Sequence, residues 1–370
     1  MQPIRFIMVG GFLGAGKTTA IGRLARHYTD SGLKVAVVTN DQAYGLVDTM
    51  SLKAQGFAVG EVPGACFCCK FDDLISVSAS LRKDQIPDII ITEPVGSCTD
   101  LVATVIEPLR HLHGDEYEIA PLAVLLKPGH GLKILRDESG QGFSPKAAYI
   151  FLKQLEEADV IVINKVDKLD AGRREELGSL IGSRFPGRTV IEHSSQNGEG
   201  FDSLVEALAG ERRLPVEYMD VDYDIYAEGE AELGWLNASY KLTANGDGML
   251  AINAVAKQFV AICRDLMKQA DVEPAHLKTL AEAADGTAAL ANLVGSDVDV
   301  ELSVSNESQA SEVELTVNAR VATGPGNLST IVDQAVEKLS QELGCTSVEV
   351  SKQSFRPGRP TPTHRMGASE

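Results

Sequence analysis

Short apolar runs alternate with amphipathic stretches over the first part of the chain. The apolar runs, rich in β-branched residues, are expected to be buried strands at 4–9, 34–39, 88–92, 121–127, 159–164 and 189–192. The stretches between them that favour helices are 18–29, 72–82, 144–158 and 201–208. Continuous apolar strands separated by helices are typical of a parallel sheet that is covered on both faces. The pattern therefore predicts an α/β domain over residues 1–211, with a mainly parallel sheet flanked by helices.

The pattern changes from residue 232 onward. Residues 235–242 alternate as in a strand, and apolar residues recur at helical spacing over 249–270. A helical insertion at 274–293 is then expected before two strands, a helix and a last strand, at 297–305, 312–321, 328–343 and 347–351. Without the insertion the order is β-α-β-β-α-β, which is the ferredoxin-like arrangement.

These patterns predict two domains and two connecting stretches. We expect an α+β ferredoxin-like domain at 232–354, which by analogy of fold would recognise a partner or form a homodimer. An acidic linker covers 212–231, and the Pro-rich, basic stretch within 355–370 is expected to be a flexible tail. The length of 370 residues agrees with two domains, since one domain usually takes about 100 to 200 residues.

Composition and charge exclude several classes of partner. The chain is 44% hydrophobic and 23% charged, and no apolar run approaches the roughly 18 residues of a membrane span. The formal charge of −18 repels a phosphate backbone, which argues against a nucleic acid partner. The first residues enter a strand without a cleavage site of small residues, so we expect a cytoplasmic protein with no membrane partner.

A phosphate-binding loop stands between the first expected strand and the first expected helix. The sequence GGFLGAGKTT at residues 10–19 fits the pattern G-x-x-x-x-G-K-[ST]. Lys17 would reach the β- and γ-phosphates of a nucleotide, and the Thr18 hydroxyl would bind Mg²⁺. A glycine-rich turn without a ligand is the alternative. The expected phosphate-binding residues are Gly11, Gly14, Ala15, Gly16, Lys17, Thr18 and Thr19.

Two acidic positions at strand ends extend this site. Residues 40–48 occupy the place of a nucleotide-responsive switch loop, where Asp41 would contact Mg²⁺, unless it is an ordinary turn acid. Glu93 ends the third strand and would lie near the metal or polarise the attacking water, and the Gly96 N–H would meet the γ-phosphate. The expected catalytic residues are Lys17, Glu93 and Asp41, and the expected Mg²⁺ ligands are Thr18, Asp41 and Glu93.

The tetrad Asn164-Lys165-Val166-Asp167 indicates guanine rather than adenine. Asp167 would accept hydrogen bonds from the guanine N1–H and amino group, while Asn164 and Lys165 brace the loop and the base. Adenine offers no matching pair of donors, so it would leave the carboxylate unpaired. After the next strand, a backbone N–H or a hydroxyl of Ser194 or Ser195 would support the guanine O6. We therefore expect GTP and GDP as ligands.

Three cysteines within four residues, Cys66, Cys68 and Cys69, lie in a loop before a helix. Neighbours this close do not form a disulfide framework, and three thiolates suit Zn²⁺, Co²⁺ or Cu⁺. Cys98 is a candidate fourth ligand, and with three ligands alone the metal keeps an open position that suits transfer. Buried or redox-active thiols without metal are the alternative. Cys263 and Cys345 are isolated and are expected to be packing residues.

These motifs together resemble the CobW-like family of P-loop GTPases, relatives of the nickel-insertion GTPases that serve urease and hydrogenase. The resemblance covers about the first 210 residues and rests on GGFLGAGKTT, the Glu93-Pro-x-Gly element, NKVD and the C-x-C-C cluster. It implies a GTP-dependent metallochaperone with these cysteines as ligands, zinc or cobalt as metal, and a client metalloprotein or corrinoid protein. The chain reads NDQAY at 40–44 where the family tends to read Asn-Glu-Phe-Gly-Glu, and it has no histidine-rich stretch.

Two functional hypotheses follow. In the first, an Mg²⁺-dependent GTPase couples its nucleotide state to the cysteine site and delivers metal to a client. Hydrolysis is expected to be slow, about 10⁻⁴ to 10⁻³ per second, since no arginine finger is evident. In the second, a GTP-driven switch reactivates or assembles a cofactor enzyme without metal transfer, and the thiols are structural.

Overall fold

The computed structural model describes residues 3–41, 47–82, 86–136, 144–212, 218–296 and 298–367. The chain divides into two compact units. The first contains Met1–Gln42, Gln55–Gly229 and Arg359–Glu370, and the second contains Ala43–Ala54 and Glu230–Gly358. Two segments thus fall elsewhere than the sequence boundaries place them: 43–54 groups with the second unit, and 359–370, expected as a flexible tail, groups with the first.

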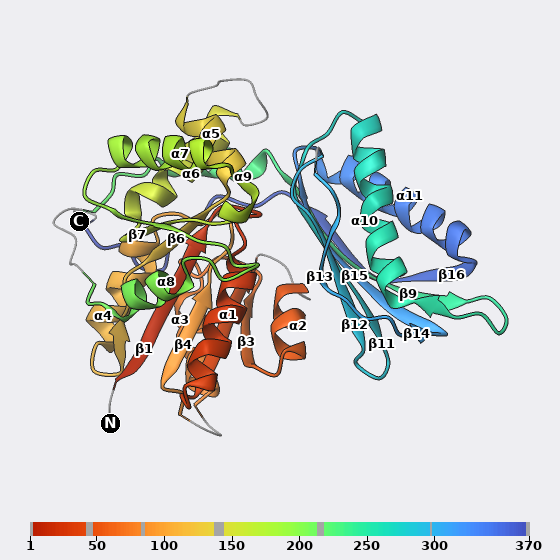
Figure 1. Cartoon of the computed structure of the whole chain (residues 1–370), viewed down its shortest axis with the longest axis horizontal. Coiled ribbons are helices and arrows are strands. Elements are labelled where there is room, and N and C mark those ends of the chain that lie inside the picture. Colours follow the sequence, from red (N-terminus) through yellow and green to blue (C-terminus); the bar gives the residue numbers. More distant parts are fainter. Residues whose placement is uncertain are drawn as a thin grey trace. The chain divides into compact units, whose positions relative to one another are not determined.

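The first unit is built on a parallel sheet (Figure 1). Its strands follow the order β3-β2-β4-β1-β6-β7-β8, with β5 beside β1, and every recorded pair is parallel. The bounds are β1 Ile4–Gly11, β2 Val35–Asp41, β3 Ala58–Pro63, β4 Ile89–Glu93, β5 Tyr117–Ile119, β6 Ala123–Leu126, β7 Val160–Ile163 and β8 Thr189–Glu192. The mainly parallel sheet is confirmed. The sequence missed β3 and β5, which are short or only half-buried.

Helices connect these strands, and local signals start two of them. The Ser144 hydroxyl accepts from Ala147 N at 3.0 Å, and Asp170 Oδ1 accepts from Arg173 N at 2.9 Å, which caps free N–H groups. The helices are α1 Lys17–Asp30, α3 Phe71–Ser80, α4 Glu107–His113, α5 Pro128–Leu135, α6 Pro145–Glu157, α7 Ala171–Arg184, α8 Phe201–Ala209 and α9 Tyr223–Ala231. A π-helical turn, Val102–Ile106, runs into α4. Among the described residues, no helix has the length and apolar character to cross a membrane.

The second unit is an antiparallel sheet in the order β13-β12-β11-β15-β9-β16, packed against the long helices α10 and α11 and the short helix α2. The order β16-β9-β15-β11 is that of a ferredoxin-like sheet, and β12 and β13 extend it at the β11 edge. The elements are β9 Gly234–Ala244, α10 Ile252–Gln269, β11 Pro274–Ala283, β12 Ala288–Leu293, β13 Glu301–Val304, β15 Glu312–Val321, α11 Pro325–Leu343 and β16 Cys345–Phe355. A two-strand ladder joins β10 (Leu250–Ala251) to β14 (Gln309–Ala310).

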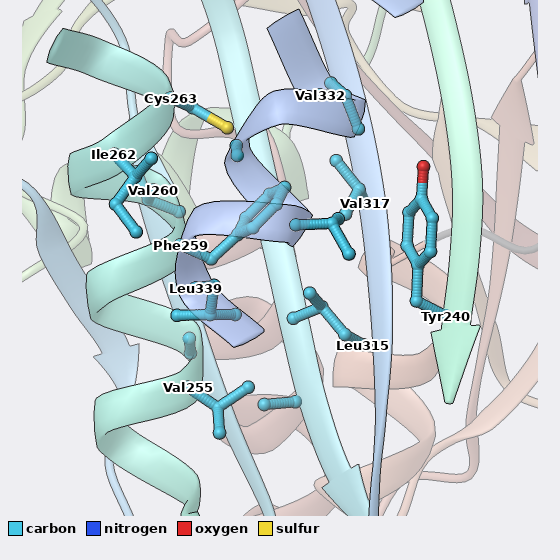
Figure 2. Close-up of a cluster of buried hydrophobic side chains, with 14 of the residues drawn as sticks. Tyr240, Val255, Phe259, Val260, Ile262, Cys263, Leu315, Val317, Val332 and Leu339 are labelled. Atoms are coloured by element: carbon cyan, nitrogen blue, oxygen red, sulfur yellow. The ribbon is translucent and has the colours of Figure 1, made fainter. Parts of the chain in front are cut away.

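Both long helices of this unit bury their apolar side chains against the sheet (Figure 2). Phe259 of α10 and Leu339 of α11 pack in one cluster with Leu315 of β15. Fully burying a side chain of this size contributes about 1.5 to 3 kcal/mol. Cys263 and Cys345 belong to the same cluster, which confirms them as packing residues.

A short helix, α2 (Val47–Ala54), packs on this sheet although it comes early in the chain. Val47 is buried with Leu280 and Leu290 in a small separate cluster. Its N–H donates to Asn318 Oδ1 at 2.8 Å, and Asp48 forms an ion pair with Lys278. The start of α2 is therefore tied to the second unit by apolar and polar contacts.

The expected helical insertion at 274–293 is wrong, because these residues form the hairpin β11–β12. The segment is rich in alanine, leucine and glutamate, which favour helices. Some of its side chains are buried in the main core of the second unit, and others pack against α2. Because apolar side chains are thus buried in two places, the sequence lacks the alternation of polar and apolar residues that marks a half-exposed strand. Gly286, at φ 83°, supplies the left-handed turn between the two strands.

Candidate functional site

The glycine-rich loop after β1 is shaped by its glycines. Gly11 and Gly16 have φ values of 132° and 92°, which side chains rarely adopt. A Cβ on Gly16 would lie 2.5 Å from Asn164 Nδ2, and one on Gly11 would lie 2.2 Å from Leu125 O. These two positions therefore require glycine for both backbone conformation and space. Gly14 also has a positive φ, of 73°.

Polar groups from β1, α1 and β4 meet at this loop. Lys17 is buried and donates from Nζ to Gly11 O at 2.9 Å, folding over the loop. Thr18 Oγ1 donates to Glu93 Oε1 at 3.1 Å, although 75 residues separate them. Gly96 lies so close that a Cβ there would be 3.1 Å from Lys17 Nζ. Oxygen donors of this kind are those that Mg²⁺ prefers.

The end of β2 faces a different neighbour. Asn40 is buried, and its Nδ2 donates to Val62 O and Ala65 O, each at 2.7 Å. Its Oδ1 accepts from Phe67 N at 2.8 Å, inside the C-x-C-C loop. The next residue, Asp41, is half-buried, and its carbonyl accepts from Gly64 N at 3.0 Å. Of the rest of the expected switch loop, residues 42–46 lie outside the described residues, and residues 47 and 48 begin α2.

The tetrad after β7 is linked to the glycine-rich loop. Asn164 is fully buried and donates from Nδ2 to Ala15 O at 2.7 Å. Its Oδ1 accepts from both Ser195 N and Ser195 Oγ, at 2.9 and 3.0 Å, so both Ser195 donors bond Asn164 in this structure. Asp167 Oδ1 accepts from Ser194 Oγ at 2.5 Å. Lys165 adopts a left-handed conformation with φ 62°.

Arg23 of α1 also supports this end of the site, and the sequence reasoning missed it. Its Nε donates to Ser195 O at 3.1 Å and its Nη2 donates to Gln196 O at 2.9 Å. These bonds hold the loop after β8 against α1. No motif marks such a residue, because its acceptors are backbone carbonyls that lie far away in sequence. Thr19, expected at the phosphates, is exposed beside it on α1.

The three cysteines form one compact thiol cluster. The Sγ–Sγ distances are 3.3 Å for Cys66–Cys68, 3.6 Å for Cys66–Cys69 and 3.7 Å for Cys68–Cys69. Tetrahedral zinc with Zn–S bonds of about 2.3 Å separates its sulfur ligands by about 3.8 Å. Cys66 and Cys68 are buried, whereas Cys69 is half-buried. The three sulfurs therefore have the spacing and the softness of a zinc or cobalt site.

Hydrogen bonds within the cluster shift the pKa values of its thiols in opposite directions. Hydrogen bonds from Cys68, Cys69 and Cys98 hold the pKa of the Cys66 thiol well below its usual value. The hydrogen bond that Cys69 makes to Cys66 raises the pKa of Cys69 to about 11, and the pKa of Cys68 is also raised, first by its bond to Cys66. Binding a metal to all three sulfurs must release protons.

Two residues of α6 hydrogen-bond to the backbone of residues 96–102. Gln154 Nε2 donates to Gly96 O at 3.0 Å and to Cys98 O at 2.8 Å. Glu157, on the same helix, accepts from Val102 N at 3.0 Å. Burial raises the pKa of the Glu157 carboxyl to about 8. These two residues and Asn40 were not found from the sequence, since a single polar residue that becomes buried by tertiary packing belongs to no sequence motif.

Comparison with known proteins agrees with this arrangement. A family model described as CobW/HypB/UreG, nucleotide-binding domain, matches residues 5–191, slightly more than half of the chain. The chain is 32% identical over 169 residues to the zinc chaperone YeiR of Escherichia coli, covering 44% of this chain and 46% of that protein. It is 28% identical over 242 residues to the zinc chaperone CobW of Pseudomonas aeruginosa, covering 56% and 58%. The chain therefore spans about half the length of these curated relatives.

A solved structure resembles the chain over more of its length. The Zn(II)-bound YjiA GTPase from Escherichia coli aligns with a TM-score of 0.40 and 17% identity, covering 92% of this chain and 99% of that one. The family assignment rests instead on the model match across β1 to β8, which includes the glycine-rich loop, the thiol cluster and the NKVD tetrad. On that match, the chain belongs to the CobW/HypB/UreG family.

Proposed function

We propose that this chain is an Mg²⁺-dependent, GTP-hydrolysing metallochaperone whose nucleotide state changes the metal affinity of Cys66, Cys68 and Cys69. The observation that carries this proposal is the position of Asn40. It bonds the thiol loop (residues 64–70, between β3 and α3) twice, at Ala65 and Phe67, and the end of β3 once, at Val62, with distances of 2.7 to 2.8 Å. It immediately precedes Asp41 at the end of β2. A shift at this strand end is thereby passed to the thiol cluster.

Each part of the nucleotide site has an assigned role in this proposal. Lys17 and the N–H groups of the glycine-rich loop hold the phosphates, because a helix N-terminus and a lysine favour anions. Thr18 and Glu93, which are hydrogen-bonded, would provide oxygen ligands for Mg²⁺, with Asp41 at the end of β2 as a further candidate. The Mg²⁺ would neutralise charge during phosphoryl transfer. Asp167 reads guanine, and Gly96 meets the γ-phosphate.

The thiol cluster is assigned to a metal cargo. Zinc is the first candidate, since two relatives are named zinc chaperones and the sulfur spacing suits tetrahedral zinc. Cobalt has similar geometry and serves as its spectroscopic substitute. A site with three protein ligands leaves a position through which a client metalloprotein or corrinoid protein can take the metal. The second unit is assigned to recognition of that client or of a second copy.

The test is an anaerobic titration of reduced protein with Co²⁺ and Zn²⁺. The Mg²⁺-GDP complex is compared with the complex of Mg²⁺ and a non-hydrolysable GTP analogue. We expect thiolate-to-cobalt charge-transfer bands and an affinity that differs between the two states by about 5- to 150-fold. Cys68→Ser should remove the bands, while Cys345→Ser, in the core of the second unit, should keep them. Absence of the bands in both states would instead favour the GTP switch without metal transfer.

A further inference from the structure

The segment 359–367 packs onto the thiol loop within the first unit. Thr361 N donates to Cys69 Sγ at 3.2 Å. Two residues later, Thr363 N donates to Cys68 O at 2.7 Å and Thr363 Oγ1 donates to Cys69 O at 3.2 Å. The segment thus bonds the backbone of the cluster and one of its sulfurs.

An ion pair anchors the same segment beside the loop that follows Gly96. Arg365 Nε donates to Asp100 Oδ2 at 2.7 Å, and its Nη2 donates to Met219 O at 2.9 Å. Asp100 is only 1% exposed, and its Oδ2 also accepts from Tyr223 OH at 2.7 Å. Met366 N donates to Ala103 O at 2.8 Å. A buried carboxylate held by an arginine and a tyrosine is a firm anchor, because removing either partner leaves a buried charge less compensated.

The anchoring residue, Asp100, lies on a short stretch, 96–100, that contacts both the glycine-rich loop and the thiol cluster. Gly96 lies beside Lys17, and Cys98 interacts with Cys66 and contributes to lowering its pKa. Asp100, two residues further, holds Arg365. If residues 96–100 move, Cys66 is affected directly through Cys98. Cys68 and Cys69 are affected indirectly, through the segment 361–366.

We propose that the segment 361–366 helps to set the metal affinity of the thiol cluster. The Thr361 N–H strengthens metal binding at Cys69, and the Arg365–Asp100 pair ties that binding to the stretch that follows Gly96. An N–H donor favours a thiolate over a thiol, and a metal binds the thiolate. Groups that hydrogen-bond to ligating atoms typically change metal affinity by about 10- to 100-fold. This inference rests on the proposed metal role of the cluster.

A matched pair of variants tests the N–H donor. Thr361→Pro removes the N–H, whereas Thr361→Ala keeps it and changes only an exposed side chain. We expect Thr361→Pro to weaken Co²⁺ binding about tenfold, measured against a chromophoric chelator, and to alter the charge-transfer bands. Thr361→Ala should bind Co²⁺ as the wild type does. Equal affinities for all three proteins would overturn the role of the N–H.

A second pair tests the anchor. Arg365→Ala should reduce the ratio of Co²⁺ affinities between the GDP and GTP-analogue complexes, and Arg365→Lys, which keeps the charge, should restore part of it. Thermal unfolding of each metal-free variant checks that it is folded. A ratio in Arg365→Ala equal to that of the wild type would overturn the coupling role. If the wild type itself shows no thiolate bands, the proposed metal role fails and this inference fails with it.

Discussion

Replacing Asn40 tests whether the end of β2 holds the thiol loop. Its buried side chain makes bonds of 2.7, 2.7 and 2.8 Å, of which those to Val62 O and Phe67 N are buried and the one to Ala65 O is partly buried. Each such bond contributes about 1 kcal/mol net, and a buried group left unpaired costs about 1 to 3 kcal/mol more. Asn40→Ala breaks three bonds and leaves at least one buried partner unpaired, so it should lower the free energy of unfolding by at least about 4 kcal/mol.

Asn40→Asp makes the same test sharper. The carboxylate has nearly the shape of the amide and still accepts from Phe67 N. It places an oxygen, in place of a donor, against the carbonyls of Val62 and Ala65. We expect it to destabilise at least as much as Asn40→Ala. Thr92→Val is the control, since Thr92 is buried on β4 and its hydroxyl makes one bond, to Ile7 O at 3.2 Å, worth about 1 kcal/mol.

Two assays measure the effects of these substitutions. Urea denaturation gives the free energy of unfolding, and Co²⁺ titration gives the affinity of the cluster. We expect both Asn40 variants to bind Co²⁺ at least about tenfold more weakly, and Thr92→Val to bind it as the wild type does. If Asn40→Ala keeps both the wild-type affinity and the wild-type stability, then Asn40 does not hold the thiol loop.

Two further predictions concern the other parts of the first unit. Gly16→Ala should reduce affinity for a fluorescent GTP analogue more than tenfold, since its methyl group would meet Asn164 Nδ2. Gly32→Ala, with a similar φ of 85° and nothing within 4 Å, should leave that affinity unchanged. Glu157, with a folded pKa of about 8 against 4.5, carries a proton in the folded protein that the unfolded chain has lost between these pH values. Stability should fall there as pH rises, by up to about 1.4 kcal/mol per unit, and urea titrations of Glu157→Gln should show that slope removed.

The arrangement of the glycine-rich loop and the NKVD tetrad was largely predictable because the information for these motifs is local, while their role in nucleotide binding stays a prediction. The glycine-rich loop and the NKVD tetrad are each specified by a run of consecutive residues. Because the carboxyl ends of parallel strands lie at the same edge of the sheet, the two motifs come together there. The contact between Thr18 and Glu93 follows from this rule, although the residues are far apart in sequence. The positive φ of Gly16 and its closeness to Asn164 explain why the motif requires a glycine there.

The support of the thiol cluster was not predictable, because it is made by tertiary contacts of unremarkable residues. Asn40 was recognised only as the end of a strand, and its partners lie in a loop whose backbone path the sequence does not specify. Segment 359–367 is rich in proline, which favours an extended loop in isolation. Its hydrogen bonds to Cys68 and Cys69 depend on acceptors presented by the folded first unit.

The sheet order gives a physical reason why the proposed metal site would respond to a nucleotide at the glycine-rich loop. In the parallel ladder of β2 and β4, Thr39 lies opposite Glu93. Asn40 therefore lies one residue beyond the level of Glu93, on a strand about 4.8 Å away. β3 pairs with β2 on its other side, and the thiol loop begins where β3 ends. A ligand that moves Glu93 or Gly96 thus acts on residues adjacent to the supports of the thiols, so coupling between the two sites requires no long path through the core.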